Sequence, residues 1–445
     1  MKSSVVLALV LASCMPSERS VRGPVDADLA TRMGERVSLG EKDPAIDALL
    51  ATPLDEHAAV RIALANSPRM RAALAELGIA RGELGAALGL GPLGIDYMQR
   101  FGAWNTSTQS RPYEFEIEVI QNINGLMTAP RLRAAGRADI AAARASVTAT
   151  ALRLAGKVEI AFHDLVAAQQ EIELRRTAFD AADAAALIRE RMHEAGNTTD
   201  LAQARDRDAR EQARVDLGRA EATVEVAREQ INALLGLTGD QTKWTAAGAL
   251  ADLPAAAPAL DDLETVAVRA SVDIAGGSAR VDSAANRLAA ERVHTWLPEL
   301  GVGASVVEHG AGVEVGPAVR LGIPLFDHRR GQRARAKAEL GRAEDELTAV
   351  AVELRARARA VRIRAIAAYE EARHLRDVVL PLRQQIVDQT LLHYNAMDAN
   401  PFELIIARRE LADAGHQYLD ALRRYWNASS EVTALRRGVQ LDAME

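Results

Sequence analysis

A change of periodicity within residues 301–361 restricts the possible folds of this chain more than any other feature. Four apolar residues alternate with four polar or small ones, which is typical of a strand with one apolar and one polar face. The apolar set is Val313, Val315, Val319 and Leu321, and the other set is Glu314, Gly316, Ala318 and Arg320. Steps of three and four then take over at Leu340, Ala343, Leu347, Val350, Leu354, Ala358 and Val361. This heptad-like spacing predicts a very long helix packed along its side.

Composition supports a fold that is mainly α-helical with a small β part. The chain has 445 residues, of which 49% are hydrophobic but only 4% aromatic. An alanine-rich chain with few aromatics packs helices closely along a seam, so we expect long coiled-coil hairpins. The net charge of −7 argues against a nucleic-acid partner. We interpret one basic cluster, Arg329, Arg330, Arg333 and Arg335, as the solvated start of a helix.

The first residues predict an export signal. Lys2 precedes a short apolar run at residues 5–11, which is far below the roughly 20 residues of a spanning helix. The following Leu-Ala-Ser-Cys resembles a bacterial lipoprotein signal, which implies removal of residues 1–13 and lipid attachment at Cys14. An ordinary signal peptide is the alternative, but Cys14 is the only cysteine and has no disulfide partner in the chain. Met15 after it favours, by the same resemblance, the outer membrane. Residues 14–53 are expected to form an extended tether.

Two copies of one unit are expected to follow, at residues 54–236 and 262–437. Each copy has a helix, a pair of extended segments and a long helical hairpin. Residues 237–261 contain glycine and proline and predict a linker, and residues 438–445 a tail.

The extended segments predict two strand pairs, residues 95–103 with 113–122 and residues 300–307 with 313–323. Tyr113, Phe115, Ile117 and Val119 fall on one face of the second segment, whereas Glu114, Glu116 and Glu118 fall on the other. Three acids cannot be buried without partners, so that face needs water. A soluble two-layer sheet remains possible. Five aromatics on the first pair favour a membrane instead, as expected near bilayer interfaces; they are Tyr97, Phe101, Trp104, Tyr113 and Phe115.

Long helical hairpins follow both strand pairs. The first is expected at residues 131–192 and 200–235, and the second at 333–393 and 402–435. Gly-Asn and Asn-Pro stop signals place the turns between them. The predicted tip residues are Gly196, Asn197, Thr198 and Asp200 in the first hairpin, and Asp398, Asn400, Pro401 and Glu403 in the second. Arg408 is a candidate partner for the two acids of the second tip.

Four strands are too few to close a barrel, and lipid does not tolerate open sheet edges. A membrane protein with these strands must therefore pool them among several chains, and three chains would supply twelve. The conduit would be lined by the polar strand faces, which carry Glu114, Glu116, Glu118, Glu314 and Arg320.

The order of these parts resembles that of the TolC-like outer membrane efflux proteins, over nearly all of residues 54–437. Individual motifs are loose: Pro298 before a strand, Ile-Pro-Leu-Phe-Asp at residues 323–327, and Tyr394 near the second tip. The first copy has Asn-Ile-Asn-Gly at residues 122–125 instead, and the second tip has Met397 where the first has Gly196. The resemblance implies a homotrimer with one shared transmembrane β-barrel in contact with outer membrane lipid and an α-barrel in the periplasm. It also implies a function, the efflux of solutes received from a periplasmic adaptor and an inner-membrane transporter. It also implies that the tips meet the adaptor or narrow the pore.

No catalytic, cofactor or metal site is predicted. The nine histidines lack metal-type spacing, His163 and Asp164 are adjacent and point to different helix faces, and the chain has no nucleophile elbow or phosphate loop. The alternative function is that of a lipid-anchored coiled-coil adaptor or a structural periplasmic protein without a pore. Acidic lumen residues weakly favour cations, but drugs, metal ions and siderophores all remain possible cargo.

Overall fold

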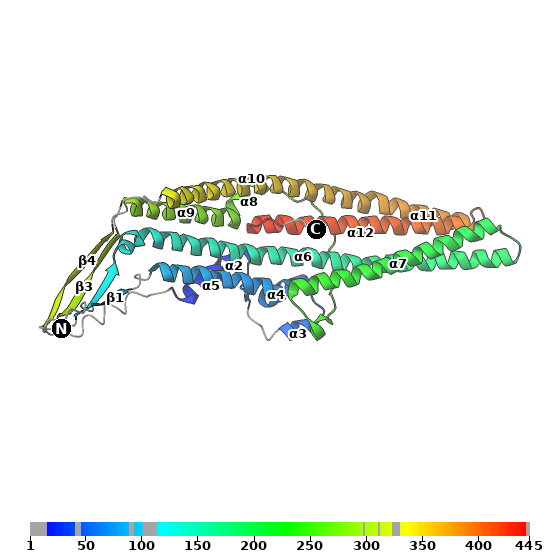
Figure 1. Ribbon diagram of the computed structural model, residues 1–445. Helices are drawn as coiled ribbons and strands as arrows, with labels where there is room; N and C mark the ends of the chain where they lie inside the picture. The colour runs from blue at the N-terminus through cyan, green and yellow to red at the C-terminus, as the bar shows by residue number, and fades with distance from the viewer. Residues whose placement is uncertain are drawn as a thin grey trace. The chain divides into compact units, whose positions relative to one another are not determined.

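The computed structural model describes residues 16–40, 46–88, 93–100, 114–296, 299–309, 312–322 and 330–441. Within these ranges the protein consists of long helices and one four-stranded antiparallel sheet, which confirms the predicted fold class at this level (Figure 1). The chain divides into two compact units. The first comprises Met1–Val25, Leu74–Val147 and Asp273–Ala351, and the second Asp26–Ala73, Thr148–Val272 and Val352–Glu445.

One order of elements occurs twice along the chain. The first series is α4 (Glu56–Asn66), α5 (Pro68–Leu88), β1 (Leu93–Arg100), β2 (Glu114–Asn122), α6 (Asn124–Glu194) and α7 (Asp200–Leu235). The second series is α8 (Leu263–Ala270), α9 (Val272–Trp296), β3 (Glu299–His309), β4 (Gly312–Gly322), α10 (Arg330–His374), the π-helical segment η2 (Leu375–Val379), α11 (Leu380–Asn395) and α12 (Pro401–Arg437). Ser67 and Ser271, the C-caps of α4 and α8, mark the same break between two helices in each series.

The sheet has the strand order β1-β2-β3-β4, and every neighbouring pair is antiparallel. Both strand pairs expected from the sequence are present. In addition, β2 pairs with β3 and places Glu118 opposite Ser305, so the strands of the two series form one sheet. The side chain of Asn124 fixes this join, because its Oδ1 accepts a hydrogen bond from the backbone N of Leu300 at 2.8 Å.

Small residues let the helices of the first unit approach closely. A Cβ atom on Gly136 of α6 would lie 2.8 Å from Leu84 of α5, and one on Gly277 of α9 would lie 2.9 Å from Leu347 of α10. At Gly276 it would lie 3.1 Å from the Cβ of Ala145 in α6. Ordinary carbon contacts are about 3.5–4.0 Å, so these helix pairs depend on glycine at the contact points.

The second unit has the larger described core. Ile62, Leu64, Leu152, Leu165 and Ile231 are almost fully buried there.

The predicted linker, residues 237–261, packs against this second unit. It contains the short 3-10 helix η1 (Gly239–Thr242), and Trp244 is buried and donates from Nε1 to Asn232 Oδ1 at 2.8 Å. Its backbone also accepts hydrogen bonds from two aromatic side chains, Tyr369 at Pro254 O and Trp426 at Ala251 O. Residues 237–261 are therefore held in place by burial and hydrogen bonds.

The prediction of an extended segment at residues 14–53 is wrong for two parts of it. Residues Glu18–Met33 form helix α2, and Ile46–Leu50 form the short α3. Val21, Val25 and Leu29 recur every four residues and are buried, so this apolar stripe outweighs the polar, glycine and proline content that suggested a tether. In the second unit, Arg32 Nη1 donates to the carbonyls of Ala270 at 2.8 Å and Arg437 at 2.7 Å, at the ends of α8 and α12.

Both long helices differ from their predicted extents. Helix α6 begins at Asn124, seven residues before the expected start at 131, and contains Pro130 within its first turns. The second long helix is interrupted by η2. Pro381 follows this segment, and a proline ring clashes with the carbonyl four residues earlier in a regular α-helix. A local switch to π-helical bonding relieves that clash, which the periodicity of the sequence did not reveal.

The heptad-like seam predicted in α10 is confirmed. Leu354, Ala358 and Val361 are buried, whereas Leu340, Ala343, Leu347 and Val350 are half-buried.

Candidate functional site

The pairing register gives the sheet two chemically different faces. Glu118 lies opposite Asp96 of β1 and Ser305 of β3, and Ser305 lies opposite Gly316 of β4. Because opposite residues share a face and side chains alternate along each strand, the polar face follows from these pairs. It contains positions 96, 114, 116, 118, 314 and 320. All five residues predicted to line the conduit therefore occupy one face.

An ion-pair cluster spans the polar face. Arg320 of β4 contacts Asp96 of β1, and its Nη2 lies 3.1 Å from Oε2 of Glu118 in β2. The arginine reaches across β3 where that strand has Gly301 and Gly303 and therefore no side chain in its path. Among the side chains that the structure describes on this face, Asp96, Glu116, Glu118 and Glu314 are acidic and only Arg320 is basic. The face keeps a net negative charge after pairing.

The opposite face of the sheet is mainly apolar and is largely exposed in the single chain. It carries Ile95 and Tyr97 of β1, Phe115, Ile117 and Val119 of β2, and Val313, Val315, Val319 and Leu321 of β4. In the single chain Val315 is 72% exposed and Ile95 is 69% exposed. A patch of large apolar side chains of this extent indicates contact with lipid or another protein.

Both edges of the sheet are open within the described residues. Strand β1 pairs only with β2, and β4 pairs only with β3. The inner pairing is tight, because a Cβ atom on Gly303 would lie 1.8 Å from the carbonyl oxygen of Val119. The open edges offer backbone hydrogen-bonding groups to further strands.

The two hairpin tips have the same turn geometry. Gly196 has φ 75° and Met397 has φ 61°, which is the only positive φ of a non-glycine residue in the described chain. The matching positions inferred from sequence therefore share the left-handed conformation, which glycine adopts freely and methionine adopts with strain. Thr199 caps α7 by accepting from Ala202 N, and Asn400 caps α12 by accepting from the backbone N atoms of Phe402 and Glu403.

Each tip also carries a histidine–carboxylate pair. His193 Nε2 lies 3.5 Å from Oδ1 of Asp200 at the first tip, and His393 Nδ1 lies 2.9 Å from Oδ2 of Asp398 at the second. Arg408 is not the partner that the sequence suggested for the acids of the second tip. The carboxylate of Glu403 instead accepts from Asn400 Nδ2 at 2.9 Å.

A groove in the second unit runs beside the tips, between the α6–α7 hairpin and α12. Its cavity volume is about 510 Å³, and small alanines such as Ala181 and Ala185 alternate with charged residues along it. Arg189 of α6 joins the walls, since its guanidinium lies 3.4 Å from the ring centroid of Phe402 and its Nε lies 2.5 Å from Oδ2 of Asp206. This cation–π contact connects the two hairpins.

Comparison with known proteins agrees with this geometry. No family model matches the chain. The cobalt-zinc-cadmium resistance protein CzcC of Cupriavidus metallidurans is 23% identical over 387 residues, which cover 86% of this chain and 90% of CzcC. The CmeC outer membrane channel of Campylobacter jejuni superimposes with a TM-score of 0.69 at 15% identity, covering 88% of this chain and 87% of CmeC. The outer membrane protein VceC of Vibrio cholerae gives a TM-score of 0.70 at 15% identity, covering 86% and 96%.

The chain has the fold of the TolC-like outer membrane channels. The resemblance seen in the sequence is thereby confirmed at the level of the fold. In the part of the chain that the structure describes, no helix is both long and apolar enough to span a bilayer. The described residues also contain no group of three or more His, Cys, Asp and Glu side chains suited to a metal ion.

The sequence pattern did not single out two residues of this channel fold, because their roles depend on contacts between distant segments. Asp96 joins the polar face, and Arg189 links the tips. Cys14, predicted to carry the lipid, and the aromatics Phe101, Trp104 and Tyr113 lie outside the described residues, as does the side chain of Glu114.

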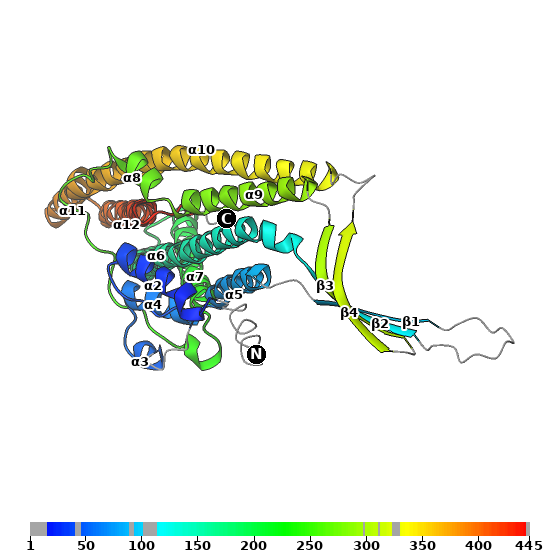
Figure 2. The same ribbon diagram turned by 90° about the vertical axis from the view of Figure 1, so that its left-hand side faces the viewer.

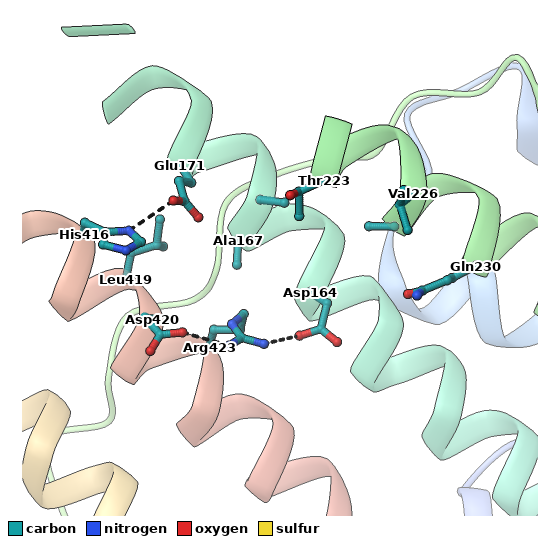
Figure 3. Close-up of a pocket in the computed structure, with 12 residues that line it drawn as sticks. Asp164, Ala167, Glu171, Thr223, Val226, Gln230, His416, Leu419, Asp420 and Arg423 are labelled. Carbon is teal, nitrogen blue, oxygen red and sulfur yellow. Dashed lines mark hydrogen bonds and ion pairs between the residues drawn. The ribbon is translucent and has the colours of Figure 1, made fainter. Parts of the chain in front are cut away.

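A second cavity, of about 330 Å³, lies between α6, α7 and α12 (Figure 3). Arg423 of α12 donates to Asp164 of α6 at 2.9 Å and to Asp420 of its own helix at 2.7 Å. His416 Nδ1 lies 3.3 Å from Oε1 of Glu171. The Arg423–Asp164 ion pair and the His416–Glu171 contact join α6 to α12.

Proposed function

We propose that this protein is the trimeric outer membrane channel of a tripartite efflux system. The observation that carries the proposal is the sheet, which has one apolar face, one acidic face and two open edges. Lipid would cover the apolar face and water the acidic one. Three copies joined from β1 of one chain to β4 of the next would give twelve strands and leave no free edge.

The remaining parts of the proposal follow the proteins of similar fold, which are channels. The long helices would form a periplasmic conduit, and the tips would meet a periplasmic adaptor that connects to an inner-membrane transporter. Gly196, Asn197, Thr198 and Asp200 would contribute from the first tip, and Asp398, Asn400, Pro401 and Glu403 from the second. Cys14 would anchor the mature chain to outer membrane lipid after removal of residues 1–13.

For cargo, we propose divalent transition-metal cations. The similarity to CzcC, whose name refers to cobalt, zinc and cadmium resistance, supports this class. The excess of Asp96, Glu116, Glu118 and Glu314 over Arg320 on the polar face also favours cations, because a like-charged lining raises the local concentration of counter-ions.

The alternative of an adaptor without a pore is less favoured. CmeC and VceC match this chain over 88% and 86% of its length. No catalytic function is proposed.

The test is conductance of the purified full-length protein in planar bilayers, together with its mass in detergent. The expected result is a trimer that forms cation-selective pores, with selectivity reduced by the double change Glu116→Gln and Glu314→Gln. As a matched control, Glu308→Gln removes an acid from the apolar-face register of β3 and should leave selectivity unchanged. A monomer that forms no pores would instead support the adaptor alternative.

Metal export is tested separately by growth of a deletion strain on zinc, cobalt and cadmium. Unchanged tolerance to all three metals, with conductance intact, would exclude the proposed cargo but retain the channel.

A further inference from the structure

A basic hollow lies between α9 and α10 in the first unit, and we call it the α9–α10 hollow. Its volume is about 740 Å³, within the range of about 300–1,000 Å³ that is usual for ligand sites. Four cationic side chains line it, Arg292 of α9 and Arg330, Arg333 and Lys337 of α10, together with the apolar Leu288 and Val293.

Within the described residues, the α9–α10 hollow has no counter-charge. None of the described residues that line it is acidic, and none of its four cations forms an ion pair with another described residue. Neighbouring arginines on the same helix do: Arg335 lies 2.8 Å from Glu339, and Arg342 lies 3.3 Å from Glu346. The chain carries a net charge of −7, so this cluster is an exception to its overall charge. Four like charges around one space favour an anion within it.

The position of the hollow is beside the ends of the strands. Helix α9 leads into β3, and α10 follows β4, so both helices run side by side up to the sheet (Figure 2). Arg292 lies about one turn before the end of α9 at Trp296, and Arg330 is the first described residue of α10. The hollow therefore borders the segment whose apolar face needs lipid.

The first series of elements repeats the same pattern after its own strands. At the start of α6, Leu126 and Met127 are exposed apolar residues, 51% and 55% respectively. Arg131, Arg133 and Arg137 follow them, and these exposed arginines form no ion pair with another described residue. An apolar strand followed by a helix with basic residues in its first few turns is the order expected where a chain leaves a bilayer through a layer of anionic headgroups.

We propose that the α9–α10 hollow binds the phosphate of an anionic phospholipid headgroup in the leaflet that borders the periplasm. The proposal rests on the proposed function, because only a membrane-inserted sheet brings lipid to this place. The planar guanidinium groups of Arg292, Arg330 and Arg333 suit two-point hydrogen bonding to phosphate oxygens, and Lys337 adds a point charge. Leu288 and Val293 offer an apolar surface to the glycerol and upper acyl carbons.

The test measures lipid binding to the full-length protein purified in detergent, by native mass spectrometry. Phosphatidylglycerol, phosphatidylcholine and inorganic phosphate are the probes. The wild type should prefer phosphatidylglycerol over phosphatidylcholine, and the double change Arg333→Gln with Lys337→Gln should weaken phosphatidylglycerol binding by about fivefold per cation removed. The matched control Arg335→Gln removes a cation that already has an acid partner and should change binding less than twofold.

Several results would overturn the proposal. They are an equal affinity for the two lipids, equal effects of the double variant and the control, and displacement of phosphatidylglycerol by millimolar inorganic phosphate, which would indicate a site for the soluble anion. If the double variant does not form trimers, Arg292→Gln on the other helix serves as the second variant. Conductance in bilayers of pure phosphatidylcholine separates this proposal from the channel function. If pores form there and mass spectrometry shows no preference between the two lipids, the channel function is retained and the lipid site is rejected.

Discussion

Replacing Val315 by lysine tests which face of the sheet meets lipid. Strand β4 has 11 residues, so at about 3.3 Å per residue it is about 36 Å long. A tilt of about 40° leaves about 28 Å along the bilayer normal, close to the height of a transmembrane strand band. Pro317 is the central residue of β4, and Val315 therefore lies about 5 Å from the midplane.

A lysine at this depth on the lipid face should be strongly destabilising. The cost is about 2–4 kcal/mol at the midplane and decreases toward the interfaces, which gives about 2–3 kcal/mol per chain for Val315→Lys. The adjacent change Glu314→Lys places the same side chain on the polar face, where it stays in water. We expect it to alter the free energy of unfolding by less than about 1 kcal/mol.

The assay is equilibrium urea unfolding of the full-length protein in phosphatidylcholine vesicles, followed by tryptophan fluorescence, with trimer formation checked by mass. Equal losses for the two neighbouring substitutions would refute the assignment of faces, since it rests on their alternation. Such a result would return the soluble two-layer sheet to consideration.

Three further predictions concern other parts of the chain. Cys14→Ser should abolish incorporation of labelled palmitate while trimers still form; undiminished labelling would exclude Cys14 as the lipid site. Gly196→Met should lower the stability of the first tip by about 1 kcal/mol, because the residue must adopt positive φ, whereas Met397→Gly should relieve the strain of the second; thermal unfolding that ranks them in the opposite order would contradict this. Burial raises the pKa of Glu159, and Arg437 opposes that shift, so the folded state keeps a proton above the ordinary value of 4.5. The free energy of unfolding should then fall as pH rises from that value through the raised pKa, and Glu159→Gln should flatten this slope in urea titrations at several pH values.

Features set by local backbone geometry could be predicted from the sequence. Strand alternation alone placed Glu116 and Glu118 on the polar face of one strand, and Glu314 and Arg320 on the polar face of another, because successive side chains must point to opposite sides. The turn residues likewise located both tips, since Gly196 and Asn400 determine the conformation of the backbone next to them.

Features that depend on distant segments were missed. Asp96 meets Arg320 only because β1 and β4 belong to one sheet and the glycines of β3 leave the path between them open. At the second tip, sequence distance suggested Arg408 as a partner, but the turn brings His393 to Asp398 instead. The stripe of Val21, Val25 and Leu29 was overlooked because its helix is stabilised by tertiary burial and not by its polar, proline-containing composition.

The π-helical segment Leu375–Val379 changes the rotational position of the residues that follow it about the helix axis. A π turn accommodates one residue more than an α turn, so it rotates the following helix by about 100° relative to an uninterrupted one. Val387 of α11 is buried after this rotation. Loss of a single residue from the segment would restore a regular helix and rotate Val387 by about 100° about the helix axis. It would also change the direction in which the turn with Asp398 and Asn400 leaves the helix. The direction in which the second tip points therefore depends on the length of a five-residue segment about 20 residues away from it.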